Sequence, residues 1–358
     1  MHPIQSLIIL IIAFYFLAKI VDEIFIKSLD NISDYLKLPP SVSGATFMAA
    51  GTSAPELSTT LFALFLAGAS PATGLGTVVG SAIFQILVVI GFAATIKTSY
   101  LNWKPVIRDG VLYCISILLL IWVIYDGAIT FFESSVLVFT YFLYLIVLAF
   151  WARLVDESQE PNVTEVFEEG RSQGQEKEKT VLQRIMYVLD TPFRLLPDVE
   201  KDKRWTIPIF ILSLASIAFA CYFLVIGGEA FALAIGVPPS IVALTILAGG
   251  SSVPEMIGSA IVSRQGRGDM AISNAIGSNV FDILISLGLP LMIFTGLNGT
   301  LDASDSANIT SSVFLLFATM VMVLLLLASQ RFKVSRPFGI FLIAVYVVYV
   351  IAAYSGIL

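Results

Sequence analysis

The sequence PPSVSGATFMAAGTSAPE at residues 39–56 returns at residues 238–255 as PPSIVALTILAGGSSVPE, and nine of the 18 aligned positions are identical. Farther along, GSAIFQIL at residues 80–87 is matched by GSNVFDIL at residues 277–284. Two unrelated apolar segments would not share Gly, Ser, Pro and Glu in the same order. The chain therefore contains an internal repeat, with copies separated by 199 and then 197 residues.

Composition indicates the class of protein in which this repeat occurs. Hydrophobic residues make up 57% of the 358 residues and charged residues only 13%, about half of the roughly 25% that is usual in soluble domains. So few charges cannot cover a soluble surface, which predicts an integral membrane protein. The single histidine, His2, lies at the start of the chain, and this excludes a catalytic triad or a His-ligated zinc site. Cys114 and Cys221 stand alone in apolar runs, so we expect small core residues and no disulfide.

Ten apolar segments are long enough to cross a membrane as helices, and β-strands are excluded because these segments are apolar on all sides. Of the 20 Lys and Arg residues, 19 fall in or directly beside the odd-numbered gaps between spans, and Lys19 lies in the half of the first span nearest the first gap. By the positive-inside rule this predicts both termini outside and the odd gaps in the cytoplasm, most simply at the plasma (cell inner) membrane. The predicted spans are residues 6–26, 40–67, 72–96, 106–125, 129–151, 206–228, 239–263, 269–296, 310–330 and 335–356.

The fifth gap, residues 152–205, divides the chain into a first five-span unit at residues 1–151 and a second at residues 206–358. Its first half is rich in Gly, Gln and Glu, which predicts disorder. In its second half, the apolar positions between Val181 and Leu189 have helical spacing. This spacing fits either a helix on the cytoplasmic membrane face or a plain linker helix.

Five spans is an odd number, so the second copy of the repeat enters the membrane from the opposite side. We therefore predict an all-α membrane protein with ten transmembrane helices, arranged as two inverted five-helix repeats with interrupted core helices. Inverted repeats with interrupted helices are typical of secondary transporters, whose binding sites lie at the midplane between the halves.

Three carboxylates lie deep within the predicted spans: Glu56, Glu255 and Asp282. Each costs about 2.5–3.5 kcal/mol at the centre of a bilayer. No Lys or Arg lies deep enough in another span to neutralise them; Lys19, near a helix end, is expected to snorkel. The carboxyls are therefore either protonated and bonded to neighbours, or they form a site for a mobile cation.

Proline strengthens the second interpretation. Pro55 has no N–H and releases the carbonyl of Gly51 from its helical hydrogen bond, and Pro254 does the same for Gly250. Carboxylate, hydroxyl and carbonyl oxygens around one point suit hard cations such as Ca²⁺ or Na⁺. The alternative is a proline kink whose hydroxyls bond back to their own helix. The hydroxyls in question, three and four residues before each glutamate, are those of Thr52, Ser53, Ser251 and Ser252.

The neighbouring spans add the candidate pairs Ser81 with Gln85 and Ser278 with Asp282, each four residues apart on one helix face. The glycines that precede these serines, residues 80 and 277, are expected to allow close approach or a local break. Glu229, near the outer end of the sixth span, is a candidate for an ion entrance.

On these motifs, GTSAPE with GSAIFQILVVIG and GSSVPE with GSNVFDILISLG, the chain resembles the cation/Ca²⁺ antiporter superfamily, the sodium/calcium exchangers. The stretch VSRQGRGDMAISNAIGSNVFDILISLGLP at residues 262–290 is most similar to the potassium-dependent branch. The sequence departs from the family at Gln85, where Asn or Asp is usual. It also has Ala82 in place of the Asn of the GSN triplet, as the potassium-dependent branch does. The GNxxEH pattern of the Ca²⁺/H⁺ branch is absent.

The resemblance implies a role for each matching position. Glu56 and Glu255 would be the main Ca²⁺ ligands, and Asp282 would lie at the centre and be tied to K⁺ use. The first and sixth spans would slide past the others during alternating access. The remaining implied ligands of Ca²⁺ or of flanking Na⁺ sites are the side chains of Thr52, Ser53, Ser81, Ser251, Ser252 and Ser278, and the carbonyls of Ala49 and Ala248.

We therefore expect a secondary active antiporter that exchanges Na⁺ for Ca²⁺, with K⁺ co-transport as a further expectation, and not an enzyme. Inorganic cations and the lipid bilayer are the expected partners; no cofactor, nucleic acid or obligate protein partner is predicted. A Ca²⁺/H⁺ antiporter and a passive cation channel remain as alternatives. An intramembrane aspartyl protease would need two deep aspartates, and Asp282 alone qualifies.

Overall fold

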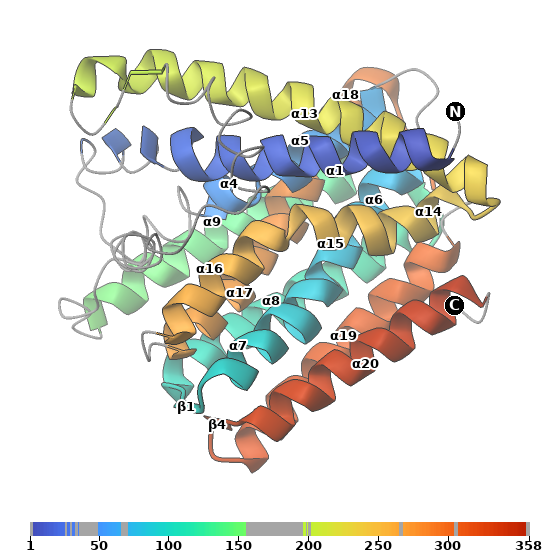
Figure 1. Cartoon of the computed structure of the whole chain (residues 1–358). Helices are drawn as coiled ribbons and strands as arrows, with labels where there is room; N and C mark the ends of the chain where they lie inside the picture. Colours follow the sequence, from blue (N-terminus) through green and yellow to red (C-terminus); the bar gives the residue numbers. More distant parts are fainter. Residues whose placement is uncertain are drawn as a thin grey trace.

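A computed structural model describes residues 3–25, 27–28, 31–32, 35, 49–65, 71–154, 196–197, 199, 202–264, 268–303 and 307–355. This part of the chain forms a helical bundle with two short β ribbons (Figure 1). The helix predicted near residues 181–189, the disorder predicted before it, and residues 39–48 of the first repeat lie outside the described residues.

The first half begins with α1 (Pro3–Ile20), which continues into the π-helical turn η1 (Val21–Phe25). A short α4 (Ala49–Thr52) precedes α5 (Ala54–Phe65). Helix α6 (Pro71–Phe84), the π-helical turn η3 (Gln85–Val89) and α7 (Ile90–Ile96) form one continuous segment. The half ends with β1 (Ser99–Tyr100), α8 (Trp103–Ile124), β2 (Ala128–Ile129) and α9 (Phe131–Leu154).

The second half follows the same order. The short 3₁₀ helix η4 (Lys203–Trp205) leads into α13 (Thr206–Ile235). Next come α14 (Pro239–Val242), the π-helical turn η5 (Ala243–Leu247), α15 (Ala248–Ser251) and α16 (Val253–Arg264). Helix α17 (Gly268–Phe281), the π-helical turn η6 (Asp282–Leu287) and α18 (Gly288–Asn298) form the next segment. The chain ends with β3 (Leu301–Asp302), α19 (Ala307–Ser329), β4 (Lys333–Val334) and α20 (Arg336–Tyr354).

Within the described residues, eight helical segments are long and apolar enough to cross a membrane. The two other predicted spans, residues 40–67 and 239–263, contain the repeated proline motifs, and each is interrupted. Ser53 separates α4 from α5, and Ser252 separates α15 from α16. The all-α membrane fold with interrupted helices is therefore confirmed, and the total of ten spans stays a prediction.

The two β ribbons reveal the inverted relation of the halves. Strand β1 pairs antiparallel with β4, and β2 pairs antiparallel with β3. Because α8 runs from β1 to β2 and its 22 residues extend about 33 Å, the two ribbons lie at opposite ends of the bundle. Helix α19 runs from β3 to β4 and is thus antiparallel to α8. Beside the ribbons, the amide of Leu101 donates to the Phe332 carbonyl (2.9 Å), and that of Ala303 donates to Gly127 (2.7 Å), in the same relative positions.

Helix α6 lies at the centre of the bundle. Of its 14 residues, all but Pro71 are buried, so the helix is covered on every side. The main hydrophobic core surrounds α6 and α7 with side chains from α8, α9, α17, α18, α19 and α20. Free Cys221 is buried and free Cys114 is half-buried against this core, so the expectation of apolar packing without a disulfide is confirmed.

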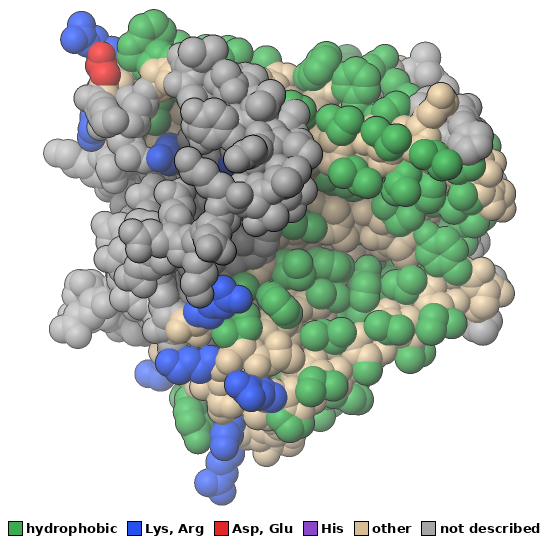
Figure 2. All heavy atoms as spheres, in the orientation of Figure 1, with side chains coloured by type: hydrophobic (Ala, Val, Ile, Leu, Met, Phe, Trp, Pro, Cys, Tyr) green, Lys and Arg blue, Asp and Glu red, His purple; other side chains and the backbone are tan. Residues whose placement is uncertain are grey.

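The surface separates into an apolar region and a basic end. Figure 2 shows hydrophobic side chains over most of the visible bundle, with Lys and Arg side chains at the end where β1 and β4 lie and also at the upper left, near the start of α13. The start of α1 and the end of α20 lie at the other end (Figure 1). This separation agrees with the charge partition of the sequence. Asp109, near the start of α8, is only 5% exposed and forms a salt bridge with the adjacent Arg108 (2.8 Å).

Candidate cation site

The two glutamates of the repeat motifs occupy equivalent positions. Glu56 lies in the first turn of α5 and is fully buried, and Glu255 lies in the first turn of α16 with 5% exposure. The first turn of a helix has amides without helical partners and carries a partial positive charge, which stabilises a carboxylate in an apolar environment. The helix breaks therefore place both carboxylates where negative charge is tolerated.

The breaks themselves are identical in hydrogen-bond pattern. The amide of Ser53 donates to the Ala49 carbonyl (2.9 Å), and the amide of Ser252 donates to the Ala248 carbonyl (3.3 Å). These carbonyls also receive hydroxyl hydrogen bonds, from Thr52 (3.4 Å) and from Ser251 (3.1 Å) respectively. Each carbonyl thus has hydrogen-bond partners within its own motif. For the Thr52 and Ser251 hydroxyls, this agrees with the alternative interpretation, a proline kink whose hydroxyls bond back to their own helix.

One hydrogen bond connects the two halves at the motifs. Besides its contact within α15, the hydroxyl of Ser251 donates to Oε1 of Glu56 at 2.8 Å. Residues 195 positions apart in sequence, one from each copy of the repeat, therefore meet in the protein interior. This contact brings the second motif to the carboxylate of the first.

A second cluster lies beside the first. The Ser278 hydroxyl donates to Oε1 of Gln85 (2.9 Å), and the Gln85 amide donates to Oδ2 of Asp282 (3.4 Å). All three side chains are buried, and Gln85 and Asp282 are the equivalent positions of the two repeats. Each is also the first residue of a π-helical turn, η3 or η6. π-helical turns are rare in proteins, and those that occur often lie at functional sites.

The two clusters form one polar centre. Glu56 and Asp282 are close enough to interact electrostatically, and Ser53 and Ser286 adjoin Asp282. The Ser286 hydroxyl also donates to the Ser53 carbonyl at the break (3.4 Å). Ser81 lies fully buried on α6 and donates to Val78 of its own helix (3.0 Å).

Several oxygens at this centre have unused bonding capacity. Within the described part of the chain, Oε2 of Glu56, the hydroxyl of Ser252 and Oδ1 of Asp282 are buried without a hydrogen-bond partner. Buried polar groups are normally paired, so these oxygens are suited to a ligand that supplies positive charge. Among the described residues, no three His, Cys, Asp or Glu side chains converge on one point. A cation here would therefore also need the hydroxyl, amide and carbonyl oxygens, a donor set that fits Ca²⁺ and Na⁺.

Glu229 occupies a different place from the buried glutamates. It lies on α13, is half-buried, and accepts a hydrogen bond from Thr73 of α6 at 3.0 Å. The contact joins α13 to the helix that carries Ser81. The structure thus brings Glu229 to the central helix without bringing it into the two clusters described above.

Gly80 and Gly277, the glycines of the second pair of motifs, differ in how closely the described residues approach them. A Cβ at Gly80 would collide with the Leu244 carbonyl, so the predicted close approach is confirmed there. At Gly277, the nearest atom to an added Cβ among the described residues is the Tyr144 hydroxyl at 4.0 Å, and α17 is unbroken at this point. The residues of the first repeat that correspond to η5 lie outside the described part of the chain, so the expectation for Gly277 stays a prediction.

Sequence reasoning missed two aromatic residues near this centre. A Cβ on Gly250 would collide with the ring of Phe14, so α1 covers the break between α15 and α16. Tyr113 of α8 is fully buried and interacts electrostatically with Asp282. Neither lies in a repeated motif, and only tertiary packing brings them to the site.

Comparison with known proteins gives a match to each half of the chain. The family described as "Sodium/calcium exchanger protein" matches residues 6–150 and 205–355, both halves without the intervening loop. Sodium/potassium/calcium exchanger 5 of Homo sapiens is 31% identical to this chain, over 92% of the chain and 79% of the human protein. Sodium/potassium/calcium exchanger 2 of Gallus gallus is 27% identical, over 96% of the chain and 76% of the avian protein.

Solved structures give a match of fold. The structure of the sodium-calcium exchanger NCX_Mj soaked with Na⁺ and Sr²⁺ aligns with a TM-score of 0.59 and 22% identity. The alignment covers 98% of this chain and 99% of the other. The two chains therefore have the same helical architecture.

Proposed function

Because the chain belongs to the sodium/calcium exchanger family, we propose that it is a secondary active antiporter that exchanges Na⁺ for Ca²⁺, with K⁺ co-transported with Ca²⁺. The family consists of transporters. The observation that carries the proposal is the hydrogen bond from Ser251 to Glu56, which joins two equivalent helix breaks around buried oxygens. K⁺ is included because relatives that match most of the chain are named sodium/potassium/calcium exchangers.

Competition for the same oxygens produces the exchange. If ionised, Glu56, Glu255 and Asp282 contribute a charge of −3. One Ca²⁺ with one K⁺, or three Na⁺, would neutralise this charge, and the same oxygens cannot hold both sets at once. The empty site would carry uncompensated charge across an apolar barrier, which is costly and suppresses uncoupled movement.

Individual residues receive the following roles in this proposal. Glu56 and Glu255 bind Ca²⁺, Asp282 binds the monovalent cation at the centre, and Glu229 lines the outer entrance. Gln85 adjusts the central position, where its longer amide reaches both Ser278 and Asp282. The other ligands of Ca²⁺ or Na⁺ are Thr52, Ser53, Ser81, Ser251, Ser252 and Ser278, and the carbonyls of Ala49 and Ala248.

Packing supports movement of α1 and α13 as a unit. These two helices share a hydrophobic cluster that includes Leu10, Leu17 and Leu224 and is separate from the main core. The cluster extends to the rest of the bundle through Ala54 and Ala243 among others. Shear movement, in which packed helices slide past one another by small amounts, is one established way for separately packed bodies to move. We propose that this movement opens the site to each side of the membrane in turn.

The proposal also includes orientation. Both termini lie outside the cell membrane, and residues 152–205 form a cytoplasmic loop between units 1–151 and 206–358. The support is the collection of exposed basic residues at the β1–β4 end, which includes Lys97, Lys104, Arg331 and Lys333.

The test is uptake of ⁴⁵Ca²⁺ into proteoliposomes that contain the purified protein, with Na⁺, K⁺ and pH gradients imposed one at a time. We expect uptake driven by an outward Na⁺ gradient, stimulated by K⁺ on the Ca²⁺ side. Glu56→Gln should abolish it, and Glu133→Gln, a change in the α9 capping group that accepts from Thr130, should leave it. Uptake driven by a pH gradient without Na⁺, or undiminished flux in Glu56→Gln, would overturn the proposal.

A further inference from the structure

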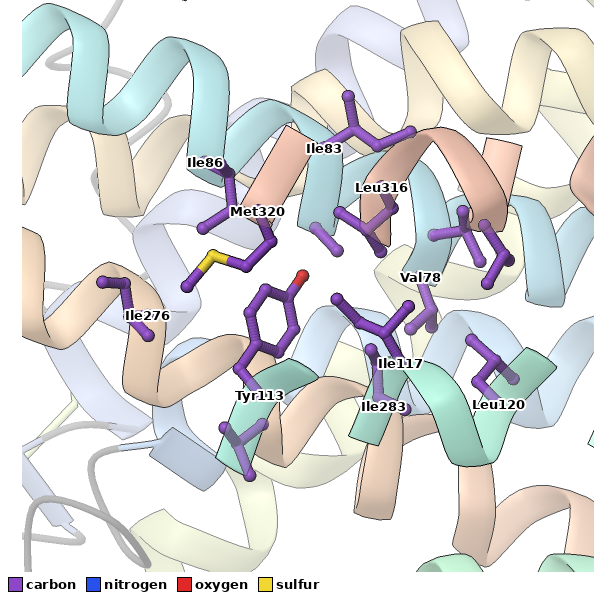
Figure 3. Packing of buried hydrophobic residues seen from close by; sticks show 14 of the residues in the cluster. Val78, Ile83, Ile86, Tyr113, Ile117, Leu120, Ile276, Ile283, Leu316 and Met320 are labelled. Atoms are coloured by element: carbon purple, nitrogen blue, oxygen red, sulfur yellow. The ribbon is translucent and has the colours of Figure 1, made fainter. Parts of the chain in front are cut away.

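Tyr113 is a fully buried side chain in the middle of an apolar cluster. Figure 3 shows its ring among Ile117 of α8 and Leu316 and Met320 of α19, with the hydroxyl pointing into the cluster. Its side chain has no exposure to solvent or lipid. A phenylalanine would fill the same volume, so packing alone does not account for the hydroxyl.

The hydroxyl is an expensive group in this position. Among the residues that the structure describes, it has no hydrogen-bond partner. A buried polar group without a partner costs about 1–3 kcal/mol. Asp282 also has an unpartnered atom: Oδ2 accepts from Gln85, whereas Oδ1 has no hydrogen-bond partner among the described residues, with Ser53 and Ser286 adjoining the carboxylate. Two unsatisfied polar atoms, a donor and an acceptor, are thus present in one region of the protein interior.

The fold places these two groups on adjoining elements. Helix α8 packs along α17 and contacts η6, the π-helical turn that begins at Asp282. Tyr113 and Asp282 also interact electrostatically. A phenol donates one hydrogen bond and a carboxylate accepts several, so a direct bond or one bridging water would satisfy both groups.

We propose that Tyr113 is a positioning residue for Asp282, whose hydroxyl donates to the carboxylate when the site is loaded with cations and thereby sets the preference between K⁺ and Na⁺. The inference rests on the proposed function. A carboxylate that accepts a hydrogen bond presents a weaker field to a cation, and field strength is one determinant of selection between K⁺ and Na⁺. The weaker field favours the larger and less strongly hydrated K⁺.

Tyr113→Phe tests the proposal because it removes one oxygen from an apolar cluster. We expect the K⁺ concentration for half-maximal stimulation of ⁴⁵Ca²⁺ uptake to rise roughly tenfold, the equivalent of losing one hydrogen bond to a charged group. Uptake at saturating K⁺ should be retained, and the melting temperature should be unchanged or higher. The matched control is Tyr349→Phe on α20, which removes the hydroxyl of another buried tyrosine (3% exposed) that lies beside Ser312.

A second measurement does not depend on transport. Cations that bind the folded protein raise its melting temperature, so titrations with KCl and with NaCl report the two affinities separately. Tyr113→Phe should weaken the K⁺ effect relative to the Na⁺ effect, and Tyr349→Phe should change neither. A ratio of K⁺ to Na⁺ midpoints within twofold of wild type would overturn the role of Tyr113. Absence of Na⁺-driven uptake by the wild type would instead overturn the antiporter proposal.

Discussion

Ser251→Ala isolates the contact that joins the two repeats. The Ser251 hydroxyl donates to Oε1 of Glu56 at 2.8 Å, and both side chains are buried. In this structure Oε2 of Glu56 has no partner within the described residues, so the variant leaves the whole carboxylate without a side-chain donor from α15. A hydrogen bond to a charged group contributes about 1.5–3 kcal/mol. About 1.4 kcal/mol corresponds to a tenfold change in affinity, so Ca²⁺ binding should weaken by at least roughly tenfold.

The assay is the Ca²⁺ dependence of Na⁺-driven ⁴⁵Ca²⁺ uptake in proteoliposomes. Ser116→Ala is the matched control: its hydroxyl is also buried and bonds to Leu112 of its own helix, α8 (3.0 Å), away from the motifs. Ser251→Ala should raise the half-saturating Ca²⁺ concentration about tenfold, and Ser116→Ala should change it less than twofold. Equal half-saturation in the two variants would refute the idea that the inter-repeat contact forms part of the site.

Two further predictions concern packing and orientation. Gly80→Ala should lower the unfolding free energy by about 1–3 kcal/mol, because the added methyl group clashes with the η5 backbone. Thermal unfolding in detergent compares the variant with the wild type, and an unchanged melting temperature would contradict the packing argument. In a variant without Cys114 and Cys221, a membrane-impermeant maleimide should label Asp302→Cys on intact cells but Tyr100→Cys only after permeabilisation, since these exposed residues belong to ribbons at opposite ends of the bundle. The reverse labelling pattern would invert the proposed topology.

The repeat motifs predicted the two helix breaks at the candidate site. A shared GxSxPE pattern specified two equivalent breaks, and the structure has them at Ser53 and Ser252 with matching hydrogen bonds. The close approach of another segment to Gly80 was also predicted from the sequence. The pattern did not indicate the π-helical turns at Gln85 and Asp282, because a π turn depends on how a helix is held by its neighbours and has no strong local signal.

The position of a residue along a span did not predict what packs against its side chain. Asp109 is near the end of a predicted span, yet it is buried, because Arg108 pairs with it and the Arg108 guanidinium lies over the Trp151 ring (5.4 Å). Tyr113 was unremarked because an aromatic residue in an apolar helix is usual in a core. Its unpaired hydroxyl becomes visible only once its surroundings are known.

The sequence alone determined that this chain is a membrane protein of two inverted halves with carboxylates at broken helices, because hydropathy, basic residues and proline act locally and are legible along the chain. Only the tertiary structure decided which oxygens meet: that Ser251 reaches Glu56, that Gln85 bridges Ser278 and Asp282, and that η5 crowds Gly80. The three hydrogen bonds join residues nearly 200 positions apart, and all of these contacts depend on how the two halves pack against each other, which no local pattern specifies.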